Sequence, residues 1–250
     1  QLEVPAVITS GSQQAAVAAD NAARTAAGTM IISATATSPE LTGGFVRTGA
    51  LWRVAPPDTF QVRVITRLLT TEPSLSSVTD IAIANENTRY GQGIALSLRE
   101  QLADAGRRTQ TFEFTSSEQP VTPSGLLDQL ASFHQSSRNP RLTVFVGFPT
   151  QGTPSITDAR LRPPLSAASG HMWFFTDAMK DTSVLTAQTK PELAGAFGTA
   201  PAQGAGGSFS RVLKYWFSAH TSSARRLPNC TPMPSGLFQR TTAGQIVSSF

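Results

Sequence analysis

Short apolar segments alternate with amphipathic segments along most of this chain. Residues 4–9 and Met30–Ser33 are short, apolar and β-branched, which predicts two buried strands. The alanine-rich stretch between them, which runs to Ala27, predicts a helix because alanine has the highest helix propensity. Gly28 suits the left-handed position that ends many helices. A strand, a helix and a second strand imply a parallel pair with a right-handed crossover.

The same alternation continues to about residue 200. Phe60, Val64 and Leu68 share one helical face, and Pro163 and Pro164 are expected to break or shorten one later helix. We expect strands at 81–84, 111–114, 142–147 and 172–175, and helices at 90–105, from 124 onward and at 155–168. This pattern predicts an α/β protein whose parallel sheets are covered on both faces.

The chain changes character after Phe197. Residues 198–208 are rich in Gly and Ala, which predicts a loop or crossover. Residues 209–219 are expected to form a helix, and residues 221–235, with three prolines, are expected to be irregular.

The composition is that of a globular chain, with 40% hydrophobic and 14% charged residues. The formal charge is +4, but the arginines are scattered, and only Arg107-Arg108 and Arg225-Arg226 form doublets. No aromatic series accompanies them, so we do not expect nucleic-acid binding.

The sequence lacks the common motifs of several kinds of catalysis and metal binding. The single cysteine, Cys230, excludes an intrachain disulfide and a multi-cysteine metal site. His134, His171 and His220 lack the spacing of helical metal ligands. Gly-x-Ser-x-Gly, a Walker loop and His-Glu-x-x-His are all missing from the sequence. We therefore expect a protein that is not an enzyme and that uses no metal or cofactor.

Export and membrane signals are also not visible. The longest apolar stretches fall far short of the roughly 20 residues that a membrane span needs. No signal peptide is visible, because Gln1 opens directly onto sequence typical of a folded domain, and we expect a processed, cloned or truncated start.

Polar residues follow the first two predicted strands. Ser10 and Ser12 open the first helix, whose free N–H groups and dipole suit a ligand carboxylate. The serines can also serve only as caps of their own helix. Thr35 and Thr37 follow the second strand and can grip the same carboxylate, or form an ordinary Ser/Thr turn. In open α/β sheets, ligands bind at this edge.

Three further residues follow later strands. Tyr90 can stack over a ligand or pack at the start of its helix. Asp177 can hold a ligand ammonium group or cap the next helix. Phe148 is a weaker candidate for a wall of the site, since core packing is the commoner role of a phenylalanine.

Four ordered motifs within roughly residues 4–200 carry a resemblance to a known family. The stretch from residue 4 to the segment Ala34-Thr35-Ala36-Thr37-Ser38-Pro39-Glu40-Leu41-Thr42 resembles the first lobe of type I periplasmic binding proteins. The nearest group is the branched-chain amino-acid receptors of ABC importers. The second motif consists of Arg53 through Pro56 with Asp58 and Gln61. The third runs from Asn87 through Tyr90-Gly91-Gln92-Gly93, and the fourth from Phe174 through Asp177-Ala178.

The resemblance implies two Rossmann-like lobes, the first formed by residues 1–57 with 200–250 and the second by residues 58–199. The turn with Ser10, Ser12 or Gln13 in the family's hydroxyl position, together with Thr35 and Thr37, would hold the carboxylate of a ligand. Tyr90 would pack on that ligand and Asp177 would meet its ammonium group.

The same resemblance implies a function. A small polar ligand, an amino acid, would be enclosed by hinge closure and passed to the membrane permease of an ABC importer. The protein would be a monomer in the periplasm or at the cell surface, with a lipid anchor as one option. A ligand-sensing domain of a membrane receptor with this fold is the first alternative, and an α/β hydrolase or transferase is the second.

One departure from the family concerns the first lobe. The family begins with a strand, helix and strand that have no counterpart here, so the first lobe is expected to be incomplete. The chain can be a fragment, a divergent variant or a domain completed by other segments. Because residues 4–9 have the character of a central strand, we expect this strand to be covered by residues outside this sequence, by another chain or by the segment after Phe209.

Overall fold

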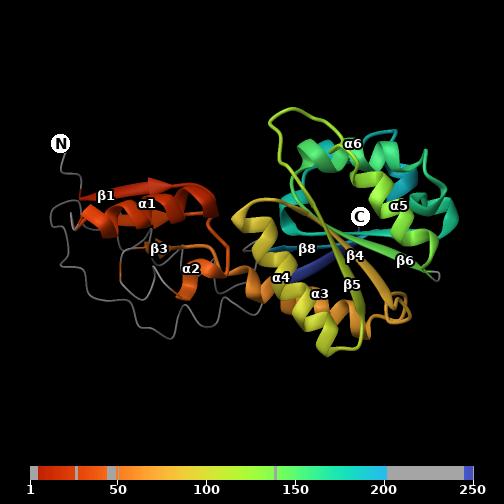
Figure 1. Cartoon of the computed structure of the whole chain (residues 1–250), viewed down its shortest axis with the longest axis horizontal. Helices are drawn as coiled ribbons and strands as arrows, with labels where there is room; N and C mark the ends of the chain where they lie inside the picture. The colour runs from red at the N-terminus through yellow and green to blue at the C-terminus, as the bar shows by residue number, and fades with distance from the viewer. Residues whose placement is uncertain are drawn as a thin grey trace, which may run out of the picture.

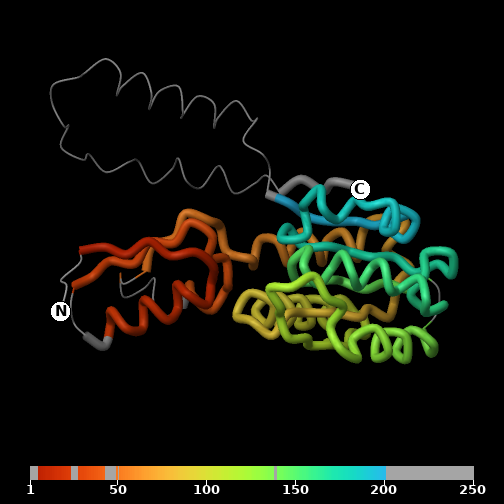
Figure 2. The backbone as a smooth tube through the Cα atoms, turned by 90° about the horizontal axis from the view of Figure 1, so that it is seen from above, coloured from red at the N-terminus to blue at the C-terminus, as the bar shows by residue number. Residues whose placement is uncertain are grey.

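The computed structural model describes residues 5–25, 28–43, 49, 51–137, 140–201 and 245–249, which form two lobes (Figure 1). The described chain passes from the first lobe to the second through the segment between residues 53 and 58 (Figure 2). The first lobe contains β1 (Ala6–Thr9), α1 (Ser12–Thr25), β2 (Met30–Ser33), α2 (Glu40–Gly43) and β3 (Leu51–Arg53).

The first lobe is a three-stranded parallel sheet in the order β1-β2-β3, with α1 against one face. Ile31 and Leu51 are buried on that face against the small side chains of Ala15 and Ala19. Alanines let the helix approach the sheet closely, so a short sheet still buries a core. The predicted parallel strand, helix and strand are confirmed.

The other face of this sheet is open to solvent. Ile8 and Trp52 are 79% and 61% exposed, and both pair in register with Ile32 of β2. Among the described residues, β1 pairs with β2 alone. Of the segments expected to cover β1, the stretch after Phe209 is described only at residues 245–249, which do not pair with β1. The rest of that expectation stays a prediction. Only one face of β1 packs on α1, and the carbonyl oxygen of Pro5 accepts from the backbone N–H of Met30 at 2.9 Å, on the side of β2.

The second lobe is a six-stranded sheet in the order β5-β4-β6-β7-β8-β9, in which only the β8–β9 pair is antiparallel. Its strands are β4 (Asp80–Glu86), β5 (Arg108–Phe114), β6 (Arg141–Val146), β7 (His171–Phe175), β8 (Phe197–Pro201) and β9 (Gln245–Ser249). Its α-helices are α3 (Asp58–Thr71), α4 (Arg89–Asp104), α5 (Leu126–Gln135) and α6 (Pro149–Ala159). Five 3-10 turns complete it: η1 (Pro163–Leu165), η2 (Ala167–Ser169), η3 (Asp177–Met179), η4 (Thr182–Val184) and η5 (Lys190–Leu193).

Helices cover both faces of the larger sheet, as the alternation predicts. Ile81 and Ile83 of β4 pack with α3 and α4, whereas Ala82 and Ala84 pack with α5 and α6. Successive residues of a strand point to opposite faces, so one strand contributes to two cores. Among the described helices, none is long and apolar enough to cross a membrane.

The helix expected at 155–168 lies earlier in the chain. It begins at Pro149, in the first turn, where a proline's missing N–H group costs no hydrogen bond. It ends at Ala159, and Pro163 and Pro164 form a separate 3-10 turn. The predicted break at these prolines is confirmed, but the helix was placed too late.

The end of the chain also differs from the expectation. The proposed loop or crossover near Thr199-Ala200 is part of β8, which pairs with β7 and β9 in the second lobe. The described parts of residues 200–250 therefore lie in the second lobe rather than the first. Gly198 and Ala200 favour strands weakly by themselves, and pairing on both sides stabilises the strand here. The helix expected at 209–219 and the irregular segment at 221–235 lie outside the described residues.

Candidate functional site

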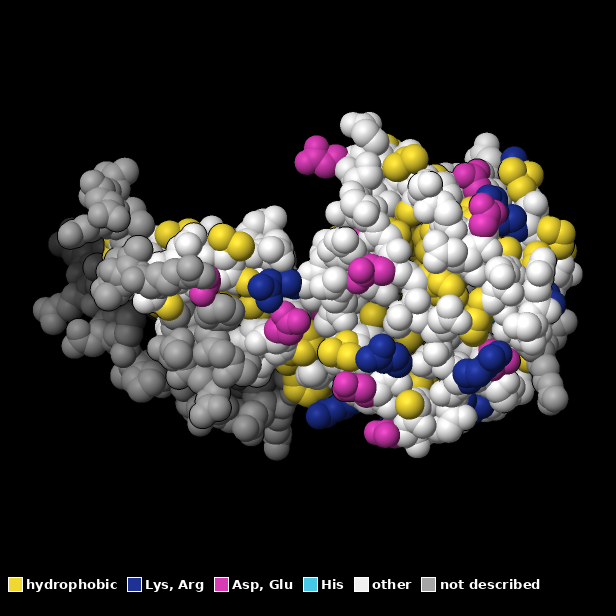
Figure 3. Space-filling view, in the orientation of Figure 1, with side chains coloured by type: hydrophobic (Ala, Val, Ile, Leu, Met, Phe, Trp, Pro, Cys, Tyr) yellow, Lys and Arg dark blue, Asp and Glu magenta, His cyan; other side chains and the backbone are white. Residues whose placement is uncertain are grey.

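A cleft of about 950 Å³ lies between the two lobes (Figure 3). It is lined from the first lobe by the turns after β1 and β2, and from the second by segments after β4, β5, β6 and β7. The carboxyl ends of parallel strands in both lobes thus meet at one place, the usual ligand edge of open α/β sheets. The structure brings together all seven residues that the sequence singled out: Ser10, Ser12, Thr35, Thr37, Tyr90, Phe148 and Asp177.

The first wall is a pair of turns tied together by hydrogen bonds. The backbone N–H of Gly11 donates to Oγ1 of Thr35 at 2.8 Å. Oγ of Ser12 accepts from the backbone N–H groups of Thr37 and Ser38 at 3.1 and 3.0 Å. The prediction that these turns lie side by side is confirmed. Ser12 therefore joins two turns, which goes beyond capping its own helix.

This wall presents donors to the cleft. Oγ of Ser12 uses its acceptor capacity on two backbone groups, so its proton is free to donate. The hydroxyl of Thr35 accepts from Gly11 and keeps its proton in the same way. Ser10 is exposed at the mouth of the turn, and α1 begins at Ser12 with its first N–H groups directed at this end. Hydroxyl protons and a helix start together suit an anionic group.

Thr37 has a different role from the other hydroxyls. Its carbonyl oxygen accepts from the backbone N–H of Asp58 at 2.8 Å, at the start of α3. Thr37 also lines the cleft. It therefore joins the first lobe to the second at the point where the chain crosses.

The second wall is centred on Tyr90 and Asp177. The Tyr90 hydroxyl lies 3.1 Å from Oδ1 of Asp177 and 3.0 Å from Oγ1 of Thr176. Nε2 of Gln61 donates to the same Oδ1 at 3.0 Å and to Oγ1 of Thr199 at 2.9 Å. Burial, and then the charge of Asp177, raise the pKa of Tyr90 well above its usual value, so its phenol stays a donor. Oδ2 of Asp177 has no hydrogen bond to a described residue, and the carboxylate does not cap η3.

An aromatic pair borders the same wall. The rings of Tyr90 and Phe148 lie 5.7 Å apart between centroids and are tilted by 38°. Phe148 is 45% exposed, so it is not a core residue, which was the alternative to its role at the cleft. The pair offers an apolar surface beside polar groups, as small-molecule sites commonly do.

Two residues of the crossover motif lie near this wall, Asp58 buried and Arg53 half-buried. Asp58 is 3% exposed, and its pKa is raised to about 7, chiefly by burial and also by the charge of Asp177, against the opposing effects of Thr37 and Arg53. Arg53 donates to the carbonyl of Ser38 at 2.9 Å, and burial lowers the pKa of this guanidinium. The Arg53 bond lies within the first lobe, whereas the backbone bond from Asp58 to Thr37 joins the two lobes at their crossing point.

A second contact between the lobes lies beside the cleft. Nη1 of Arg89 on α4 meets Oε2 of Glu40 on α2 at 2.7 Å, with both side chains about half exposed. Gly93 packs so closely on Ser38 and Pro39 that a Cβ would lie 3.1 Å from the proline ring. The start of α4 therefore rests on the first lobe.

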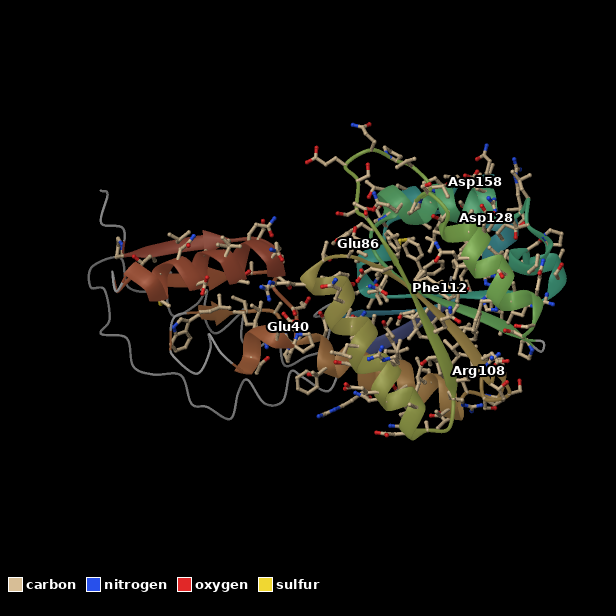
Figure 4. All side chains as sticks on the ribbon, viewed as in Figure 1. Glu40, Glu86, Arg108, Phe112, Asp128 and Asp158 are labelled. Carbon is tan, nitrogen blue, oxygen red and sulfur yellow. The ribbon has the colours of Figure 1, made fainter. Side chains whose placement is uncertain are left out.

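Sequence reasoning missed several lining residues. Glu86 is the clearest case, since it ends β4, is 2% exposed and lines the cleft. Figure 4 labels it on the part of the second lobe that faces the first. A charged residue directly after an apolar strand was the available signal. The others missed are Gln14, Thr88, Ser116, Ser117, Glu118, Pro149, Thr150, Ala178, Asp181 and Ser183.

Among the described residues, no group of three or more His, Cys, Asp or Glu side chains could hold a metal ion. Two histidines that are distant in sequence do meet. Nε2 of His134 and Nε2 of His171 both contact Oγ1 of Thr143, at 3.0 and 2.9 Å. This group is buried in the second lobe and does not line the cleft.

Comparison with known proteins identifies the fold. The sequence matches no protein-family model and no curated protein sequence. Among solved structures, a leucine-binding protein of Thermotoga maritima is similar, with a TM-score of 0.62 and 15% sequence identity. The match covers 88% of this chain and 58% of the leucine-binding protein, so this chain spans little more than half of that structure. The architecture is that of the periplasmic binding proteins, with parallel sheets flanked by helices in two lobes.

Proposed function

We propose that the protein is a solute-binding protein that holds an amino acid in the cleft between its lobes. The observation that carries this proposal is that the two walls of the cleft present opposite kinds of polar group. The first wall presents the start of α1 with the free hydroxyl protons of Ser12 and Thr35, and the second presents Asp177 beside Tyr90. Donors on one side and a carboxylate on the other match the two charged groups of a zwitterion.

The ligand carboxylate would lie against the first wall. Backbone N–H groups at a helix start favour an anion through the helix dipole, and hydroxyl donors add hydrogen bonds. The ligand ammonium would meet Oδ2 of Asp177, the oxygen left free by Gln61 and Tyr90. A charge-assisted hydrogen bond of this kind contributes about 1.5–3 kcal/mol.

Closure of the lobes would complete the site. Because each wall belongs to a different lobe, a ligand that touches both stabilises the closed arrangement over an open one. The contacts of Thr37 with Asp58 lie at the crossing point, where rotation of one lobe against the other would leave them least disturbed. The mechanism needs no covalent step, and we propose a binding protein rather than an enzyme.

The leucine-binding similarity suggests the wider role. We propose that the protein is exported, acts as a monomer, and delivers its ligand to the permease of an ABC importer. The fold supports this role by analogy, and a receptor domain that senses the same ligand would use the same cleft.

The proposal is tested by titration calorimetry with matched ligands. L-leucine is compared with 4-methylpentanoate, which lacks the ammonium group, and with leucinamide, which lacks the carboxylate. Loss of either group should weaken binding at least about tenfold, because each removes a charge-assisted bond. A panel of the other amino acids identifies the preferred side chain.

Asp177→Asn is the matching variant. It should weaken amino-acid binding by about tenfold or more and leave the affinity for the acid without an ammonium group unchanged. Asp104→Asn removes an exposed carboxylate at the end of α4, outside the cleft, and serves as the control. If no amino acid binds the unaltered protein, the proposed function is wrong.

A further inference from the structure

The charges that line the cleft are all of one sign. Among the residues that the structure describes, every charged side chain at the cleft is a carboxylate: Glu86, Glu118, Asp177 and Asp181. The whole chain is basic, with 20 Lys and Arg against 16 Asp and Glu. The acidity therefore belongs to the cleft and does not follow from the composition. A zwitterion with one ammonium group would use only one of these carboxylates.

Two described arginines near the contact between the lobes are engaged elsewhere. Arg89 pairs with Glu40 on the outer side of the lobe contact. Arg53 donates to the carbonyl of Ser38 and to the hydroxyl of Thr42. Neither side chain lines the cleft.

Glu86 is the carboxylate whose position most needs an explanation. It is 2% exposed, yet it lines the cleft, so it is enclosed by protein except towards the ligand space. Within the described residues its carboxylate has one hydrogen bond, a long contact of 3.4 Å from the hydroxyl of Thr88 to Oε2, and no ion pair. Burial raises its pKa, and only the Thr88 hydroxyl offsets that effect. A buried carboxylate without a cation is costly, so a cation supplied by the ligand would stabilise it.

We propose that the ligand carries a second cationic group and that Glu86 holds it, so that the protein binds basic amino acids such as lysine, ornithine or arginine. This inference rests on the proposed function, because the carboxylate and the α-ammonium group must already be held by the two walls.

The spacing of the carboxylates fits such a ligand. Glu86 ends β4, and Asp177 follows β7, with β6 between these strands. The pairs Asn85–Val146 and Phe145–Phe175, carried past the strand ends, place the backbone of Glu86 and of Asp177 at about the same level. Two strand spacings separate these backbone positions by about 10 Å. After a hydrogen-bond length at each end, several ångströms remain between the two ligand nitrogens, as in ornithine, lysine or arginine.

The other two carboxylates that line the cleft, Glu118 and Asp181, have a different role. Glu118 and Asp181 are exposed at the rim, and Oδ1 of Asp181 already accepts from the backbone N–H of Ser183 at 2.7 Å. Exposed charges of this kind contribute little to affinity but attract a cationic ligand towards the cleft. Glu86 is therefore the residue that should decide specificity.

The test uses pairs of ligands with the same shape and different charge. L-lysine is compared with L-norleucine, which has the same carbon chain without the ε-amine. L-arginine is compared with L-citrulline, in which a neutral ureido group replaces the guanidinium. Titration calorimetry should show that the cationic member of at least one pair binds about 10- to 100-fold more tightly.

Glu86→Gln assigns the effect to one side chain. In this variant the ratio of the lysine and norleucine affinities should fall to near one. Glu100→Gln, which removes an exposed carboxylate from α4, has the same net charge and should keep the ratio of the unaltered protein. A preference that survives Glu86→Gln would overturn the assignment to Glu86.

The outcomes separate this inference from the function on which it rests. If the neutral members bind as tightly as the cationic members, the proposal of a second cationic group on the ligand is wrong, and the proposal of amino-acid binding stands. If none of these four ligands and no other amino acid binds, the proposed function fails. The ligand pairs give this answer in the unaltered protein even if Glu86→Gln does not fold.

Discussion

Asp58→Asn should make the protein more stable at neutral pH and above. Asp58 is buried at the crossing point between the lobes, and burial raises its pKa to about 7 from an ordinary value of 3.8. The folded protein therefore binds this proton more tightly than the unfolded chain does. Stability is fully present below about pH 4 and is lost as the pH rises through about 7. Asparagine stays neutral and removes this loss.

The size of the effect follows from the shift in pKa. A difference of roughly three units corresponds to about 4 kcal/mol, which is an upper limit because the folded protein can relax around the charge. The free energy of unfolding of Asp58→Asn, minus that of the unaltered protein, should rise between about pH 4 and pH 7 and then level off.

Urea unfolding at a series of pH values measures this difference directly. Taking the difference between the two proteins removes the contribution of other titrating groups, including the buried histidines. A difference that is the same at every pH would show that Asp58 titrates normally, which would refute its buried and desolvated position.

Two further predictions concern the second lobe. Gly91→Ala should lower the free energy of unfolding by about 1–3 kcal/mol, because a Cβ at this position would lie 2.1 Å from the carbonyl oxygen of Glu86; unchanged stability in urea would contradict this packing. Burial lowers the pKa of His134 to about 4, so stability present above about pH 6.5 should be lost as the pH falls through about 4. His134→Gln should reduce this loss of unfolding free energy at low pH by up to about 3 kcal/mol. An acid transition identical to that of the unaltered protein would contradict the lowered pKa of His134.

Much of the fold and of the cleft follows from local pattern. Apolar runs such as Met30–Ser33 mark the strands, and parallel strands bring their carboxyl ends to one edge. That geometry is why Thr35 and Asp177, which are far apart in sequence, line the same cleft. Each was found because it stands directly after a strand.

The parts that sequence did not predict depend on tertiary contacts. β8 contains Gly198 and Ala200, whose weak strand preference is overridden by pairing with β7 and β9. Glu86 was missed because a charge at the end of an apolar run is usually the start of an exposed loop, whereas here it is the buried last residue of β4. The contact of Thr37 with Asp58 depends on how the two lobes meet.

The central claim is that an amino acid is held between the two lobes, and equilibrium dialysis against a mixture of all common amino acids tests it most directly. The amounts inside and outside the dialysis chamber are measured for the unaltered protein and for Asp177→Asn. The account predicts that one or a few amino acids are retained by the unaltered protein and that Asp177→Asn retains at least about tenfold less at subsaturating concentration. Equal concentrations of every amino acid on both sides of the membrane would contradict it.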